Sequence, residues 1–220
     1  MAMELESMAV EMPEVEGHPN RAEFRGVLTV VDVASQRAPS GSGGRRVVLT
    51  RRAAEEALPS LLGMALDFAP SYDRHDARRK VGVITEADVV GRNLEVGGYF
   101  YAKDFPDVVE EVAKLGRRPR LLAVARQHDG LMQATVEDGA GHEVARLRVS
   151  LRAAVEALRE VRAASAMRAG AGLGMSFEVT DAVVADRKAR IWTITHVTFT
   201  GAAVLRRDKA AFEDTWIELR

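Results

Sequence analysis

Residues 173–200 read LGMSFEVTDAVVADRKARIWTITHVTFT, and this stretch decides the fold that we expect. Over residues 173–180, apolar residues alternate with small or polar ones, and from residue 189 the stretch is rich in β-branched residues. Both patterns are typical of strands. The polar segment 186–188 between them predicts a turn, so we expect an antiparallel hairpin here.

Ser176 lies on the polar face of the first predicted strand, because Phe177 and the other apolar residues take the opposite face. A turn near residues 186–188 would pair Ser176 with His196 or with Thr198. Side chains of a strand alternate between its faces, so either register puts Ser176 and His196 on one face. A slip of one residue in the pairing would separate them.

The rest of the chain predicts more strands, with short helices between them. We expect strands at residues 24–34, 81–90 and 94–102, a hairpin at 120–137, and short helices that begin after Thr50, at Pro106 and near Arg207 or Asp208. Together these elements predict an α+β protein with a mostly antiparallel β-barrel or sheet core, flanked by short helices.

Residues 143–168 predict one long inserted helix. Apolar residues recur there at steps of three and four, which is the spacing of a single helical stripe. The stripe consists of Leu147, Leu151, Ala154, Leu158 and Val161. This helix is expected to pack on its own domain or to serve self-association.

The composition limits the possible classes of protein. The chain has 220 residues, of which 47% are hydrophobic, and a net charge of −1. Such a balance predicts a globular domain without the general basic charge that favours nucleic acid or membrane partners. There is no cysteine, which excludes disulfides and thiolate sites. No apolar run is long enough for a membrane span, and the start lacks a basic signal-peptide region, so we expect a soluble, cytoplasmic protein.

The domain organisation that we expect has two parts. Residues 1–20 carry several glutamates and no clear period, which predicts a flexible acidic arm. Residues 21–220 form one domain, with a hairpin-plus-helix insertion at about 117–170.

Few residues are candidates for the base of a serine nucleophile, which needs an imidazole in reach and a third group to orient it. The five histidines are His18, His75, His128, His142 and His196. His75 and His196 lie at or beside predicted strands, whereas the others lie in the arm, in a turn or before the long helix. The residues alone leave open a structural alternative, in which Ser176, His75 and His196 are ordinary loop and strand side chains without a catalytic role.

Three segments carry a family resemblance. Residues 75–100, HDARRKVGVITEADVVGRNLEVGGYF, contain a histidine, a polar loop, a following glycine (Gly82) and a hairpin with a leucine (Leu94). Residues 172–179 are GLGMSFEV, and residues 194–205 are ITHVTFTGAAVL. In this order they resemble the catalytic-histidine segment, the nucleophile segment and the next strand of the tailed-phage prohead maturation proteases, which share their fold with herpesvirus assemblins.

The resemblance also has departures. Phe177 and Glu178 stand where the family usually has an Ile-Gly pair. Many phage members carry an acidic residue in the third segment, whereas assemblins carry a histidine, then Val and later an Arg pair. This chain has His196 there, and its Arg206 and Arg207 lie slightly further away than the assemblin pattern.

The resemblance implies a Ser-His-His mechanism. Ser176 would attack the scissile carbonyl, His75 would transfer the proton, and His196 would hold the tautomer of His75. Asp73 and Asp76 flank His75 and compete with His196 for the orienting role. Either Arg206 or Arg207 would serve the oxyanion, and a salt bridge to Asp208 is the structural alternative for them.

The implied activity is that of a serine endopeptidase for capsid maturation. It would cleave scaffold protein, the arm of the coat protein and its own termini inside assembling proheads in the host cytoplasm. It would act as a homodimer, with no cofactor or metal and no nucleic acid or membrane partner.

The alternatives are an inactive scaffolding or structural capsid protein of the same fold, a hydrolase with another serine, and a helical interaction protein built on 143–168. The absence of a GxSxG elbow weakens the second of these.

Overall fold

A computed structural model of the chain describes residues 17–76, 78–115, 120–126, 132–137, 143–150, 152–153, 156 and 172–220. It has two short α-helices, α1 (Arg51–Ala57) and α2 (Pro106–Leu115), and a 3-10 turn, η1 (Leu58–Ser60). The strands are β1 (Arg21–Val30), β2 (Arg46–Leu49), β3 (Ala65–Phe68), β4 (Lys80–Val90), β5 (Asn93–Tyr101), β6 (Arg120–Arg126), β7 (Met132–Glu137), β8 (Glu143–Val149), β9 (Leu173–Val184), β10 (Ile191–Arg206) and β11 (Trp216–Leu219). Within these ranges no helix is long and apolar enough to cross a membrane.

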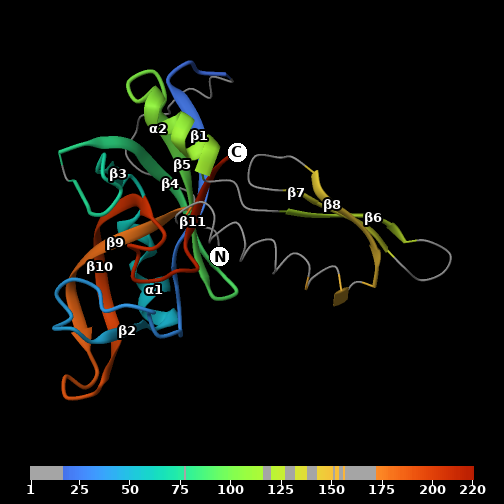
Figure 1. The fold of residues 1–220 in the computed structure, drawn as a ribbon. Helices are drawn as coiled ribbons and strands as arrows, with labels where there is room; N and C mark the ends of the chain where they lie inside the picture. The colour runs from blue at the N-terminus through green and yellow to red at the C-terminus, as the bar shows by residue number, and fades with distance from the viewer. Residues whose placement is uncertain are drawn as a thin grey trace.

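The fold is α+β and consists mostly of strands. Seven strands of an eight-stranded sheet have the order β11-β1-β5-β4-β3-β10-β2. The eighth strand, β9, also pairs with β10 and lies outside this linear order. The sheet curls into a half-barrel, with α1 and α2 at its periphery (Figure 1). Among the described strands of this sheet, all pairs are antiparallel except those of β10 with β2 and β3. The expected antiparallel core with short flanking helices is therefore confirmed.

Most of the predicted local elements are present. The stretch 173–200 forms the β9–β10 hairpin, and β4 and β5 form a second hairpin with Gly91 at φ 60° in its turn. Thr50 caps α1, since its hydroxyl accepts a hydrogen bond from the Ala53 amide at 3.2 Å. Pro106 begins α2, where its missing N–H costs no helical hydrogen bond.

The interior of the half-barrel holds the apolar faces of these strands. Phe24 and Phe100 are fully buried, with their rings 4.9 Å apart, and they join β1 to β5. Phe177 packs edge-on against Phe199 at 5.4 Å, which joins β9 to β10. The odd residues at the start of β9 thus face the core, as the alternation predicted, and Ser176 lies on the opposite face.

The long helix predicted at 143–168 is wrong at its start. Residues Glu143–Val149 form β8, which pairs antiparallel with β7, and helical structure is described only for 152–153 and 156. From Ala145 the sequence ARLRV also alternates apolar and charged residues, and pairing with β7 selects that period. The other four positions of the predicted stripe lie outside the described residues.

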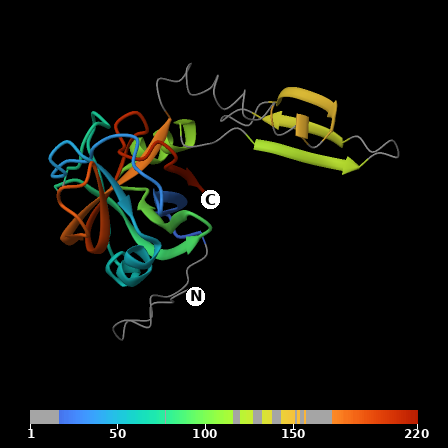
Figure 2. The ribbon, with the colours of Figure 1, turned by 90° about the horizontal axis from the view of Figure 1, so that it is seen from below.

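Strands β6, β7 and β8 form a separate three-stranded sheet, and β6 and β7 confirm the predicted hairpin at 120–137. In both ribbon views this small sheet stands away from the half-barrel (Figures 1 and 2). A helical interaction protein built on 143–168 is not supported, because its first turns are a strand.

The last helix expected near Arg207 is also absent from residues 207–220, all of which are described. Turns lead from there to β11, which pairs with β1. Phe212 is buried against Phe177, with ring centroids 6.4 Å apart, so this segment packs inward by its aromatic side chain.

Thr215 joins the start of β9 to the segment before β11. Its buried hydroxyl accepts a hydrogen bond from the Met175 amide at 3.2 Å and donates one to the Phe212 carbonyl at 3.0 Å. Gly26 permits the close approach of β1 to β11 and to β9, since a Cβ there would lie 2.5 Å from the Trp216 carbonyl oxygen and 2.8 Å from the Met175 sulfur. These contacts fix the strand that carries Ser176.

Replacement of Thr215 by Val keeps the shape but leaves the Met175 amide without its acceptor. We expect T215V to lower the free energy of unfolding by about 1–3 kcal/mol, as for other unsatisfied buried donors. Urea unfolding followed by circular dichroism measures this loss, with T215S as the control that retains the hydroxyl. Equal stability of T215V and T215S would contradict the role of this hydrogen bond.

Candidate functional site

Ser176 lies in a row of paired residues that crosses three strands. Ser176 on β9 is opposite Ala203 on β10, and Ala203 is opposite Asp67 on β3. Directly paired residues of neighbouring strands place their side chains on the same face. Two strand spacings of about 4.8 Å separate Ser176 from Asp67, and the residue between them in this row is the small Ala203.

Asp67 is a buried carboxylate that is fully paired. Its side chain is 1% exposed, and such a charge is tolerated inside a protein only with hydrogen-bond or ionic partners. Oδ2 lies 3.3 Å from the His75 Nδ1 and 3.5 Å from the Lys80 Nζ. Oδ1 accepts a hydrogen bond from the Asp76 amide at 3.2 Å. Asp67 therefore ties the loop that carries His75 to the sheet.

Two aromatic contacts anchor that loop at its ends. Tyr72, at φ 54°, packs edge-on against Phe68 with ring centroids 4.4 Å apart, and its carbonyl accepts a hydrogen bond from the Arg206 amide at 2.8 Å. Burial, followed by the nearby carboxylates of α2, raises the pKa of Tyr72 to about 12. Arg79 lies over the rings of Phe68 and Phe105. His75 is thus held between two fixed points.

His75 lies over β10, between β3 and β9. Its Nδ1 is 3.3 Å from Asp67 on β3 and 3.8 Å from the Glu178 Oε1 on β9, and these two strands flank β10. Glu178 is two positions from Ser176, so both project from the same face. The His75 ring is 17% exposed, and its Nε2 is buried without a hydrogen-bond partner among the described residues.

The structure brings Ser176, His75 and Asp67 to one face, but it does not bring His196 there. His196 is exposed and pairs with Val183, seven residues along β10 from Ala203, which is about 23 Å for a strand rise of about 3.3 Å per residue. The predicted pairing of Ser176 with His196 or Thr198 is therefore wrong.

The turn of the hairpin explains this shift in register. The turn extends to Arg190, with the Lys188 amide on the Asp186 carboxylate at 2.8 Å and the Trp192 indole N–H on the Arg187 carbonyl at 3.1 Å. A longer turn moves every pair along β10. Bulges between Ile194 and Gly201 add to the irregularity.

The two acidic neighbours of His75 have other partners. Asp73 accepts a hydrogen bond from the Ser71 hydroxyl, which holds the pKa of that carboxyl below its usual value. The Asp76 carboxylate accepts from the Arg78 amide at 3.1 Å. Asp67, which the sequence analysis missed, contacts His75 instead. Its signal in the sequence was an acidic residue inside the apolar strand ALDF.

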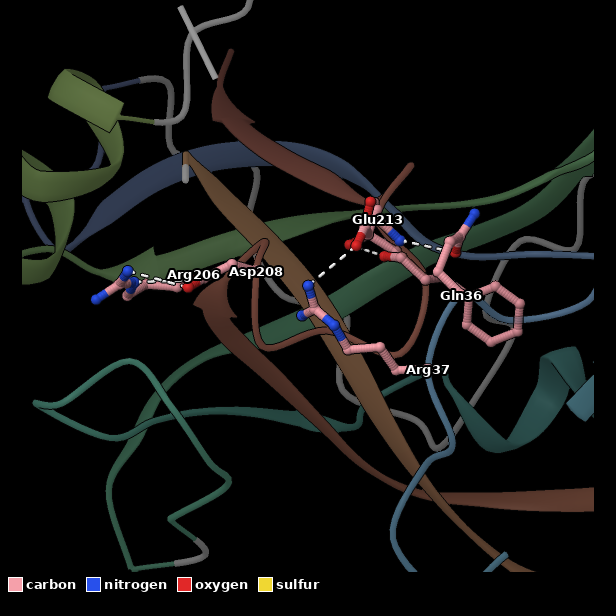
Figure 3. A network of polar contacts seen from close by, with 7 residues as sticks. Gln36, Arg37, Arg206, Asp208 and Glu213 are labelled. Atoms are coloured by element: carbon pink, nitrogen blue, oxygen red, sulfur yellow. Dashed lines mark hydrogen bonds and ion pairs between the residues drawn. The ribbon is translucent and has the colours of Figure 1, made fainter. Parts of the chain in front are cut away.

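Arg206 and Arg207 lie at the end of β10. The Arg206 guanidinium makes two contacts of 3.0 Å with the Asp208 carboxylate, as Figure 3 shows. Arg206 therefore forms the salt bridge to Asp208 that was the alternative to an oxyanion role. The Arg207 amide donates to the Gly172 carbonyl at 2.8 Å, and its guanidinium lies against the same glycine. A role of either arginine toward an oxyanion stays a prediction.

A second pair in Figure 3 fixes the segment after β10. Glu213 accepts from the Arg37 guanidinium at 3.0 Å, and its amide donates to the Gln36 side chain at 3.1 Å. These contacts tie the segment to the loop after β1.

Comparisons with known proteins do not assign a family. No family model matches the chain, and a search of curated proteins gives no significant match. Among the described residues there is also no group of three or more His, Cys, Asp or Glu side chains arranged to hold a metal ion. The function is therefore inferred from the geometry of this site and from the segments of the sequence.

Asp67 is expected to control the order of the His75 loop. Replacement of Asp67 by Ala removes the acceptor of the Asp76 amide, so this amide should exchange its hydrogen about 10- to 100-fold faster, as for a lost bond to a charged group. Amide exchange followed by NMR measures the change. D67N, which keeps one oxygen acceptor, should retain most of the protection. Equal exchange of the Asp76 amide in D67A and the unmodified chain would contradict this account.

Proposed function

We propose that this chain is a serine endopeptidase of the capsid-maturation type, with Ser176 as nucleophile, His75 as general base and Asp67 as the residue that orients it. The observation that carries the proposal is the buried His75–Asp67 contact of 3.3 Å on the face that bears Ser176. A nucleophile, a base and an orienting acid on one face are the parts that this chemistry needs.

Each residue has a defined step in the proposed reaction. Asp67 accepts the hydrogen of Nδ1, which leaves the Nε2 lone pair of His75 free to take the hydroxyl proton of Ser176. The Ser176 oxygen attacks the peptide carbonyl, and His75 gives the proton to the leaving amine. Water then hydrolyses the acyl-enzyme with the same base. The carboxylate of Asp67 stabilises the imidazolium form more than a neutral His196 ring would.

Substrate binding is part of this proposal. Ser176 and His75 are both described, and no hydrogen bond joins the Ser176 hydroxyl to the ring. Catalytic hydrogen bonds are often long or unformed in enzymes without substrate and tighten in the complex. We expect a bound peptide to complete the contact between Ser176 and the Nε2 of His75.

The substrate class follows from the resemblance of the three segments to the prohead proteases. The proposed substrates are capsid scaffold and coat proteins and the chain's own termini, inside assembling proheads of the host cytoplasm. The enzyme would act as a homodimer. The herpesvirus-protease-like fold is proposed on the same grounds, supported by the half-barrel of mostly antiparallel strands.

One observation favours a second candidate, an inactive scaffolding or structural capsid protein of the same fold. The Nε2 of His75 is buried without a partner among the described residues, which suits a ring that only anchors its loop. The two candidates differ in the reactivity of Ser176, which the next experiment measures.

A fluorophosphonate probe distinguishes an activated serine from an ordinary one, because only a hydroxyl with a base beside it reacts rapidly. We expect the probe to label the intact chain at Ser176, as located by mass spectrometry of the digested protein. Labelling should be lost in S176A and in H75A. Absence of labelling in a folded chain, or labelling of another serine, would contradict the proposed function.

The two candidates for the orienting residue predict opposite results for a pair of variants. D67N should reduce peptide-bond hydrolysis by about 10²- to 10⁴-fold, because the amide cannot hold the required tautomer of His75. H196A should keep activity within about threefold, because exposed residues far from the site have small effects. Rates of autocleavage or of cleavage of a peptide library measure both. A severe loss in H196A with activity retained in D67N would restore the Ser-His-His mechanism.

A further inference from the structure

Glu178 occupies an unusual position for an exposed carboxylate. Its side chain is 54% exposed, yet its Oε1 turns toward the site and lies 3.8 Å from the His75 Nδ1. This is the same nitrogen that Asp67 contacts at 3.3 Å from the opposite side of β10. His75 thus has a carboxylate on each side of one ring nitrogen.

Gly201 makes this position of Glu178 possible. Glu178 pairs with Gly201 across the β9–β10 ladder, next to the bulge that follows Phe199. A Cβ on Gly201 would lie 2.8 Å from the Glu178 Oε2 and 3.4 Å from its Cβ. The missing side chain therefore leaves the space through which the carboxylate crosses β10 toward His75.

We propose that Glu178 is a second positioning residue for His75, which acts with Asp67 to hold the ring in the tautomer with hydrogen on Nδ1. This inference rests on the proposed function, in which the Nε2 must be free to accept the proton of Ser176. Asp67 anchors the ring from the buried side, and Glu178, which lies on the same strand as Ser176, retains it from the solvent side.

The charges around His75 support this division of roles. Asp67 faces the ring from β3, Lys80 of β4 contacts the same Asp67 oxygen at 3.5 Å, and Glu178 faces the ring from β9. Asp76, in the loop of His75, accepts from a backbone amide instead. Lys80 offsets part of the Asp67 charge, whereas no described lysine or arginine forms an ion pair with Glu178.

The kinetic test perturbs Glu178 in two independent ways. E178Q removes the charge, and G201A displaces the carboxylate, which is the movable end of its side chain. We expect each to lower kcat about 5- to 20-fold with KM nearly unchanged, a smaller effect than loss of Asp67 because Glu178 is half exposed. The double variant should lose no more than E178Q alone, because both changes remove one interaction. E23Q, an exposed change on β1, is the matched control.

A spectroscopic readout tests the same contact without catalysis. The ring ¹⁵N shifts of His75, at a pH where the ring is neutral, report which nitrogen carries the hydrogen. We expect hydrogen on Nδ1 in the unmodified chain, and a larger fraction on Nε2 in E178Q and G201A but not in E23Q. E178D should restore part of the original population.

Three outcomes would overturn parts of this account in distinguishable ways. Unchanged kcat and tautomer in both E178Q and G201A would overturn the role of Glu178. A raised KM with unchanged kcat would overturn it as well, since Glu178 would then contact the substrate. An unmodified chain as inactive as S176A would overturn the proposed function instead, and the tautomer measurement would still decide whether Glu178 positions His75.

Discussion

The burial of the Asp67 carboxylate is the constraint on which the rest of the site depends. A charged group that is 1% exposed must find partners within the protein, and residues just before β4 and at its start supply them. His75, the Asp76 amide and Lys80 all reach the same carboxylate. The position of the imidazole is thus a consequence of satisfying one buried charge, and the loop has little freedom to place it elsewhere.

The sheet converts that constraint into a catalytic arrangement. Because β10 pairs with β9 on one side and β3 on the other, Asp67 and Ser176 come from distant parts of the chain into one row. Small residues at Ala203 and Gly201 keep the space above β10 open to side chains from both neighbours. Thr215 fixes the start of β9 and with it the position of Ser176 along the strand. A one-residue slip of β9 would turn Ser176 into the core.

Sequence patterns predicted the strands better than their partners. Alternation identified β9 and β10 and the polar face of Ser176, because side-chain period is a local property. The register of the β9–β10 pair was missed because the turn extends to Arg190. The hydrogen bonds that lengthen the turn have no recognisable sequence pattern. Residues 143–149 fit both periods, and pairing with β7 decided for a strand. Asp67 was missed because a four-residue strand gives too short a pattern to reveal that its one acidic residue is buried.

The most direct test of the central claim is an experimental structure of the protein after reaction with a fluorophosphonate. The account predicts phosphorus bonded to the Ser176 oxygen, the His75 Nε2 within hydrogen-bond distance of the phosphonyl group, and the Asp67 carboxylate still on Nδ1. A phosphonylated Ser176 whose nearest imidazole is His196, or a His75 ring that stays turned away from the phosphonate, would contradict it.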